Sequence, residues 1–181
     1  MAPPHSRKTR PFRMSKHAPI VAILAILATL ATLAAAICGG IWFWWTRPES
    51  VLRRWYLGPR PTRQKDDFVD YMPITPSEAQ RLFGLTGLNL NGYKAHAVAI
   101  DEVNHALNKH GKDKLPVTVA DILRIPYYLK NAQKVRKSQK KTHRSLEAIE
   151  YLYKDASGVT TVIEEVRVGR KKLVFQTMYK N

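Results

Sequence analysis

The sequence contains a single cysteine, Cys38, among its 181 residues. One thiol excludes an intramolecular disulfide and a zinc site made of cysteines, so the soluble part must be stabilised by its own hydrophobic core. A Gly-rich phosphate loop, a zinc motif, a Ser-His-Asp order and internal repeats are also absent from the sequence. The chain therefore gives no support to P-loop, zinc or serine-nucleophile chemistry.

Acidic residues are few as well. There are 14 Asp and Glu residues against 30 Lys and Arg residues, which gives a formal net charge of +16. This excess is larger than solubility requires and points to an anionic partner: nucleic acid, anionic lipid or an acidic protein. Charge alone does not choose among these partners, and a generic basic surface beside anionic lipid is an alternative.

Charge is absent altogether from Ala18 to Trp45. A helix of about 20 apolar residues crosses a bilayer core, so this stretch predicts a transmembrane helix over residues 18–46. The aromatic residues at its end match the belt found at a lipid–water interface, and Arg47 and Pro48 end the helix. A cleaved signal peptide is the alternative. Its apolar region spans about 7–15 residues, which is shorter than this one, so we favour an uncleaved anchor.

Three further segments surround this helix. We expect a basic tail at residues 1–17, a juxtamembrane linker at residues 47–70 and a soluble domain at residues 71–181. Basic residues flank the helix on both sides, so the positive-inside rule does not fix its orientation. A translation start at Met14 would leave few basic residues before the helix and place the domain in the cytoplasm, which is the side we favour.

The soluble domain is expected to begin with helices and end with strands. Helix-capping patterns and apolar spacing predict helices from Thr75 to Gly84, over Ile100–His110, and from Thr118 onward with a break at Pro126. A short extended piece is expected at residues 95–99. Alternating patterns then predict strands at Glu147–Tyr153, Val159–Val168 and Lys171–Tyr179. Helices followed by an antiparallel meander indicate an α+β fold.

The register of the last predicted hairpin decides which side chains share a face. A tight turn at Gly169–Arg170 places Val166 opposite Leu173, Glu164 opposite Phe175 and Val162 opposite Thr177. One face then carries Val162, Glu164, Val166, Leu173, Phe175, Thr177 and Tyr179. The other face carries Ile163, Glu165, Arg167, Val174, Gln176 and Met178. Glu164 is a carboxylate on an otherwise apolar face, so we expect it to be a general acid or base, a member of a cross-strand salt bridge, or a residue at the rim of the sheet.

Two histidines and a basic run are the other polar features. His105 and His110 lie about 140° apart around the predicted helix, which argues against a two-histidine metal site, and we expect neither metal nor cofactor. A basic run is expected to form a loop before the first strand, where it would contact phosphates or remain solvated. Its cationic members are Lys134, Arg136, Lys137, Lys140, Lys141 and Arg144.

Three segments carry a resemblance to a known group. The C-terminal GVTTVIEEVRVGRKKLVFQTMYKN resembles the ending of phage-associated Barnase–EndoU–Colicin–RelE-like nuclease domains, and IDEVNHALNKHG and LPVTVADILRIPYYLKNAQKV resemble helices of the same group. The resemblance covers roughly residues 73–181. It implies a ribonuclease-like fold, with helices packed on a small antiparallel sheet. It also implies metal-independent cleavage of RNA, through attack of a 2′-hydroxyl on the adjacent phosphate.

The resemblance also implies roles for particular residues. His105 or His110 would exchange protons, and Glu164 or Glu165 would be the partner base. Arg167 and a cation of the basic run would hold the phosphate, and Thr177 and Tyr179 would donate hydrogen bonds. The expected register divides these residues between two faces of the sheet, unless a bulge turns some of them over.

Together these features predict a nuclease or toxin-like domain of bacterial, phage or mobile-element origin, anchored in the bacterial inner membrane. RNA and membrane lipids are the expected partners, and an immunity protein or a phage or conjugation protein is a further possibility. Two alternatives stay open. One is a non-catalytic, membrane-tethered module that binds nucleic acid or protein. The other is a structural membrane protein whose basic flanks contact anionic lipid.

Overall fold

A computed structural model describes residues 18–58, 68–139, 141–142 and 144–181. Two compact units make up the chain, Met1–Trp44 and Trp45–Asn181. Helix α1 (Ala18–Thr46) covers the range predicted for the membrane helix, and the predicted basic tail at residues 1–17 lies outside the described residues. Helix α1 is long and apolar enough to cross a membrane, a test that signal sequences and core helices of soluble proteins also pass.

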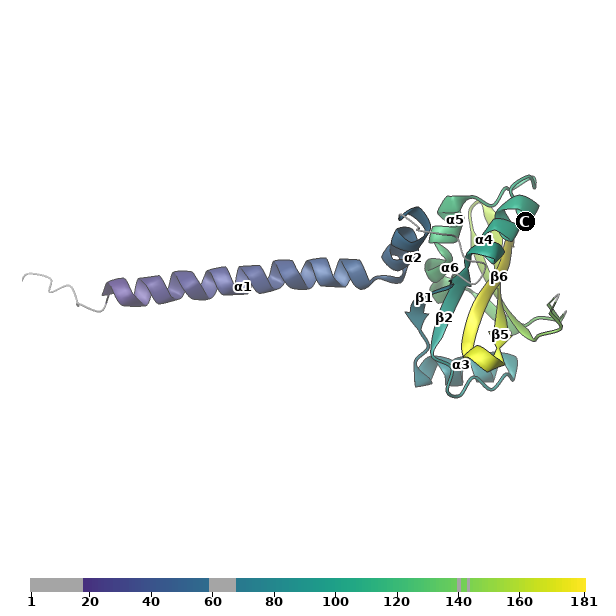
Figure 1. The fold of residues 1–181 in the computed structure, drawn as a ribbon, viewed down its shortest axis with the longest axis horizontal. Helices are drawn as coiled ribbons and strands as arrows, with labels where there is room; N and C mark the ends of the chain where they lie inside the picture. The colour runs from purple at the N-terminus through teal and green to yellow at the C-terminus, as the bar shows by residue number, and fades with distance from the viewer. Residues whose placement is uncertain (1–17, 59–67, 140, 143) are drawn as a thin grey trace, which may run out of the picture. The chain divides into compact units, whose positions relative to one another are not determined.

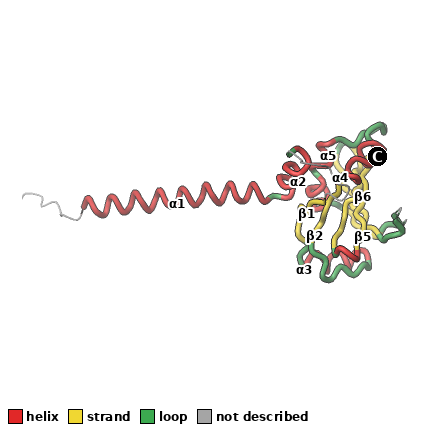
Figure 2. Tube along the Cα trace, in the orientation of Figure 1, coloured by secondary structure: helices red, strands yellow, loops and turns green. Residues whose placement is uncertain are grey.

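The second unit is built on a six-stranded sheet with the order β1-β2-β6-β5-β4-β3 (Figures 1 and 2). All neighbouring strands are antiparallel except β2 and β6, which run parallel. The strands are β1 (Phe68–Pro73), β2 (Ala95–Ala99), β3 (Lys134–Lys137), β4 (Ala148–Asp155), β5 (Gly158–Arg167) and β6 (Lys172–Lys180). The predicted α+β class is confirmed.

Helices cover both faces of this sheet. They are α2 (Pro48–Leu57), α3 (Pro76–Thr86), α4 (Ile100–His110), α5 (Val119–Leu123) and α6 (Ile125–Asn131), and a short 3-10 turn, η1 (Val168–Arg170), joins β5 to β6. Helix α4 packs against β6 and β2, whereas α6 packs against β4 and β5 and α3 contacts β3. The side chains in these contacts place α4 on one face and α3 and α6 on the other.

Local sequence explains where most of these helices begin and end. Thr75 caps α3 by accepting a hydrogen bond from the Glu78 amide, and Thr118 and Asp121 form a capping box at the start of α5. Helix α3 does not stop at Gly84 as predicted. It continues to Thr86, and Gly87 ends it with a positive φ of 70°. The low helix propensity of a single glycine is a small free-energy penalty, so tertiary packing can outweigh it.

The structure differs from the expected linker at residues 47–70. Helix α2 occupies Pro48–Leu57, where proline takes the first turn and Leu52 is fully buried, and strand β1 pairs with β2. Residues 59–67 lie outside the described residues. The basic run also differs from a simple loop, because Lys134–Lys137 forms β3 at the edge of the sheet.

The predicted register of the β5–β6 hairpin holds only near its turn. Val166 pairs with Leu173, and Glu164 pairs with Phe175, as expected. Farther along, Ile163 rather than Val162 pairs with Thr177. The cause is a β-bulge, which leaves Gln176 as an extra residue in β6 and shifts every later pair by one position.

This bulge exchanges the side chains of β6 between the two faces. Thr177 and Tyr179 move to the face that carries Glu165, and Met178 moves to the opposite face, where it is fully buried. The two faces therefore do not have the composition that the unbulged register predicts. The face covered by α4 carries Glu165, Thr177 and Tyr179, and the opposite face carries Glu164 and Met178.

Candidate active site

A cleft of about 850 Å³ lies along α4, β3 to β6 and the segment between β3 and β4. This volume falls in the range of ligand-binding pockets, about 300–1,000 Å³. Seven of the residues predicted for the site line it: His105, His110, Arg136, Lys141, Arg144, Thr177 and Tyr179. Residues from four different parts of the chain therefore meet in one hollow.

Both histidines of α4 line the cleft, although they are about 140° apart around the helix. His105 is exposed, and His110 is half-buried at the helix end. The Nδ1 atom of His110 lies 2.8 Å from the Asp113 carboxylate. When Nδ1 donates to a carboxylate, the ring is held in one tautomer and its Nε2 is left to accept a proton. His110 also contacts the ring of Tyr179, with 5.9 Å between centroids.

Four charged side chains form a cluster beside the cleft. Arg144 Nη1 donates to Glu102 at 2.6 Å and to Glu165 Oε2 at 3.3 Å. Arg167 donates to the same Glu165 oxygen, and its Nη2 lies 3.6 Å from Glu102. Glu165 is fully buried, and its other oxygen has no hydrogen-bond partner among the described residues. In this arrangement the two carboxylates hold the two guanidinium groups in place.

The basic run contributes only part of its charge to the cleft. Arg136 lines the cleft and is paired with Glu150 at 2.7 Å, whereas Lys141 lines it without an acidic partner in the described part of the chain. Lys137 instead pairs with Glu147 at 3.0 Å, and Lys134 is exposed and does not line the cleft. Lys140 lies outside the described residues.

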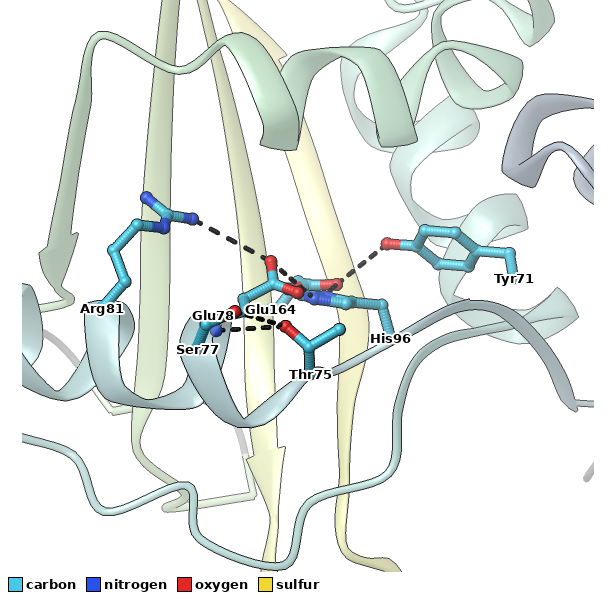
Figure 3. Close-up of polar contacts among 7 residues, drawn as sticks. All are labelled: Tyr71, Thr75, Ser77, Glu78, Arg81, His96 and Glu164. Atoms are coloured by element: carbon cyan, nitrogen blue, oxygen red, sulfur yellow. Dashed lines mark hydrogen bonds and ion pairs between the residues drawn. The ribbon is translucent and has the colours of Figure 1, made fainter.

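Glu164 is not part of the cleft. It is fully buried on the opposite face of the sheet, where both its oxygens lie near His96 Nδ1, at 2.9 and 3.1 Å (Figure 3). The Tyr71 hydroxyl donates to it at 2.9 Å. The other ring nitrogen of His96 lies 3.4 Å from Glu78 as an ion pair, without hydrogen-bond geometry. The structure thus shows the salt-bridge alternative for Glu164.

The electrostatics of this buried network are consistent with a structural role. Burial lowers the pKa of His96, but the charge of Glu164 and the contacts with both carboxylates outweigh it and raise the pKa to about 9. Burial, together with the charge of Glu164, raises the pKa of Tyr71 well above its ordinary value, so its hydroxyl keeps its proton and can donate. An imidazolium lies between two carboxylates and ties β2, β5 and α3 together.

Sequence reasoning missed several residues of the cleft. Glu102 precedes His105 by one helical turn, a spacing that could have shown that they share a side of α4. Asp113 follows α4 closely, so its approach to His110 depends on the path of the next turn. Gln176 lies on the face of Glu165 in the expected register as well, but only the bulge brings Thr177 and Tyr179 beside it, and no periodic pattern in the sequence reveals that bulge.

A family model named phage-Barnase-EndoU-ColicinE5/D-RelE like nuclease3 matches residues 74–181. The chain belongs to this nuclease-like family. The resemblance drawn from the sequence is therefore confirmed, and the match includes every residue of the cleft. No curated protein and no solved structure matches the chain. The family match covers α3 to β6 and leaves α1, α2 and β1 outside it.

Proposed function

We propose that this protein is a membrane-anchored, metal-independent ribonuclease whose active site is the cleft beside α4. The observation that carries the proposal is the convergence of His105 and His110 with cationic side chains and hydroxyl groups around one hollow. Cleavage by an internal hydroxyl needs a base, an acid and cations for the charged phosphorane, and these are the groups that the cleft contains.

The reaction begins when the 2′-oxygen of a ribose attacks the adjacent phosphorus. His110 takes the hydroxyl proton on Nε2, because its Nδ1 is engaged by Asp113. His105 gives a proton to the departing 5′-oxygen as the phosphorus–oxygen bond breaks. The products are a 2′,3′-cyclic phosphate and a free 5′-hydroxyl. This step consumes no water and needs no metal ion.

Cations and hydroxyl groups stabilise the charge that develops on the phosphate. Arg144 reaches the cleft from the segment after β3 and is 41% exposed, so it can turn from its carboxylate partners towards a phosphate. Lys141 adds a second cation. The Thr177 hydroxyl is buried at the cleft and has no partner among the described residues, which leaves it to donate to a substrate oxygen.

Helix α1 supports the membrane anchor by its length and composition. A reporter fused after Asn181 would determine the side of the membrane, and access to RNA within the producing cell requires the cytoplasmic side. A domain held outside the cytoplasm would instead favour delivery to another cell.

The test uses the full-length chain, purified in a non-ionic detergent and incubated with RNA in the presence of EDTA. Wild-type protein is expected to form cyclic phosphate ends, and His110→Ala or His105→Ala should slow cleavage by about 10²–10⁴-fold. Lys141→Ala and Lys134→Ala are a matched pair, because both lysines are exposed in the basic run and only Lys141 lines the cleft.

Two outcomes would argue against the proposal. Intact RNA after incubation with folded wild-type protein would favour the non-catalytic binding module, particularly if RNA binding weakened steeply with salt. Equal loss of activity in the two lysine variants would show that general charge, rather than the cleft, supports cleavage.

A further inference from the structure

The bulge in β6 brings Thr177 and Tyr179 to the face of the sheet on which Gln176 lies. Gln176 is the extra residue of the bulge, between the pair Glu164–Phe175 and the pair Ile163–Thr177. It is half-buried and lines the cleft together with the two residues that the bulge turns over, Thr177 and Tyr179. Bulges commonly occur beside active sites, where they redirect a side chain.

The amide group of Gln176 has no structural task in the part of the chain that the structure describes. No described residue hydrogen-bonds to it, although it carries two donors and an acceptor. Gln133 provides a contrast, because its amide accepts from the Lys154 amide at 2.7 Å and donates to the Lys154 carbonyl at 3.3 Å. One glutamine therefore fixes the backbone, while the other presents an unused amide to the cleft.

Two further features lie beside Gln176 in the cleft, an aromatic ring and a hydroxyl group. The Tyr179 ring lies in the cleft against His110 and offers a flat aromatic surface. The buried Thr177 hydroxyl, which has no hydrogen-bond partner among the described residues, is next to Gln176 in the strand. Proteins recognise single-stranded RNA by stacking an unpaired base on an aromatic side chain and by hydrogen bonds to its polar edge.

We propose that Gln176 and Tyr179 form a subsite for one unstacked nucleobase of the RNA, with adenine preferred. The base stacks on Tyr179, the Gln176 carbonyl oxygen accepts from the adenine amino group, and the Gln176 amide nitrogen donates to a neighbouring ring nitrogen. Glutamine and adenine form this two-bond pair in nucleic-acid complexes. The inference rests on the proposed ribonuclease function and adds the base at which cleavage occurs.

The test uses DNA oligonucleotides that contain a single ribonucleotide, so that only one phosphate has a neighbouring 2′-hydroxyl and only one bond can be cut. In one series the ribonucleotide carries each of the four bases in turn. In a second series the ribonucleotide is fixed and the following deoxynucleotide varies. Full-length protein in detergent is assayed under single-turnover conditions, and the two series cover the bases on both sides of the scissile phosphate.

Wild-type protein is expected to cut the adenine substrate about 10-fold faster than the others in one of the two series. Gln176→Ala should reduce the differences among bases to about 2-fold. Gln176→Glu replaces a donor with an acceptor and should favour guanine, whose polar edge offers two adjacent donors. Gln139→Glu is the control, because it adds the same charge to the same cleft and should leave the order of bases unchanged.

Equal cleavage of all four bases in both series by wild-type protein would overturn the inference while leaving the ribonuclease proposal intact. The inference would also be overturned if Gln176→Glu kept the wild-type order of base preference, or if Gln139→Glu changed that order as much as Gln176→Glu does. Absence of any cleavage would overturn both proposals. The wild-type comparison needs no variant, so a Gln176 variant that fails to fold does not remove the test.

Discussion

The buried pair of Glu164 and His96 predicts how stability depends on pH. The pKa of His96 is about 9 in the folded protein, against an ordinary value of 6.5. Each pKa unit corresponds to about 1.4 kcal/mol, so the pair contributes roughly 3 kcal/mol. Because the folded value lies above the unfolded value, this contribution is complete below pH 6.5 and is lost as pH rises through about 9.

Glu164→Gln removes the charge that raises the pKa of His96. Burial then dominates, the ring is neutral in the folded protein, and the loss of stability between pH 6.5 and about 9 should disappear. The destabilisation caused by Glu164→Gln should therefore be about 3 kcal/mol larger at the acidic end of this range than at the alkaline end. Tyr71→Phe is the control, since it removes one hydrogen bond to Glu164 but keeps the charged pair.

Urea unfolding of the full-length protein in detergent, followed by circular dichroism across this pH range, measures the effect. Wild type and Tyr71→Phe should lose stability in parallel, with a constant difference of about 1.5–3 kcal/mol. For Glu164→Gln, the free energy of unfolding should change less with pH than it does in wild type. A wild-type curve that is flat over the range, or a Glu164→Gln curve parallel to it, would refute the assignment of a buried imidazolium at His96.

The remaining predictions concern the cleft and the backbone. Arg144→Ala should raise KM for RNA and reduce the salt dependence of binding by about one phosphate contact, measured by titration at several salt concentrations. Gly158→Ala should lower the free energy of unfolding by about 2–4 kcal/mol, because φ is 136° and a Cβ would overlap the Asn181 carbonyl oxygen. Gly84→Ala, in the open middle of α3, should instead raise it by about 0.5–1 kcal/mol in the same assay. The two changes should therefore shift the free energy of unfolding in opposite directions, and destabilisation by both would contradict this reasoning from backbone conformation.

The sequence predicted the elements whose pattern is local. Helix α4 and the three C-terminal strands lie within two residues of their predicted bounds, because apolar spacing and turn residues specify them directly. The hairpin register was correct up to the pair Glu164–Phe175, since it depends on the nearby turn. It failed at Gln176, where packing of Met178 in the core and of Tyr179 in the cleft selects a bulge that leaves no periodic signal.

The candidate site was predicted less completely than the fold. His105, His110, Arg144, Thr177 and Tyr179 line one cleft, whereas Glu164 lies on the opposite face of the sheet, and the catalytic roles that the resemblance implies stay predictions. The sequence pattern offers no reason to connect His96 with Glu164. A single histidine in a short apolar strand shows no spacing to a carboxylate that would predict their contact. The ion pairs of Arg144 likewise depend on how a loop folds back onto α4. Such contacts between distant segments are set by tertiary structure.

Strand β6 lies between β2 and β5, in the interior of the sheet, although it is the last strand along the chain. Its two neighbours differ, because β6 runs parallel to β2 and antiparallel to β5. Strand β6 is thus the link between the β1–β2 part of the sheet and the β3–β5 part. A change that weakens its pairing should separate the two parts and disrupt the cleft that β6 lines, so the cleft depends on the cohesion of the whole sheet.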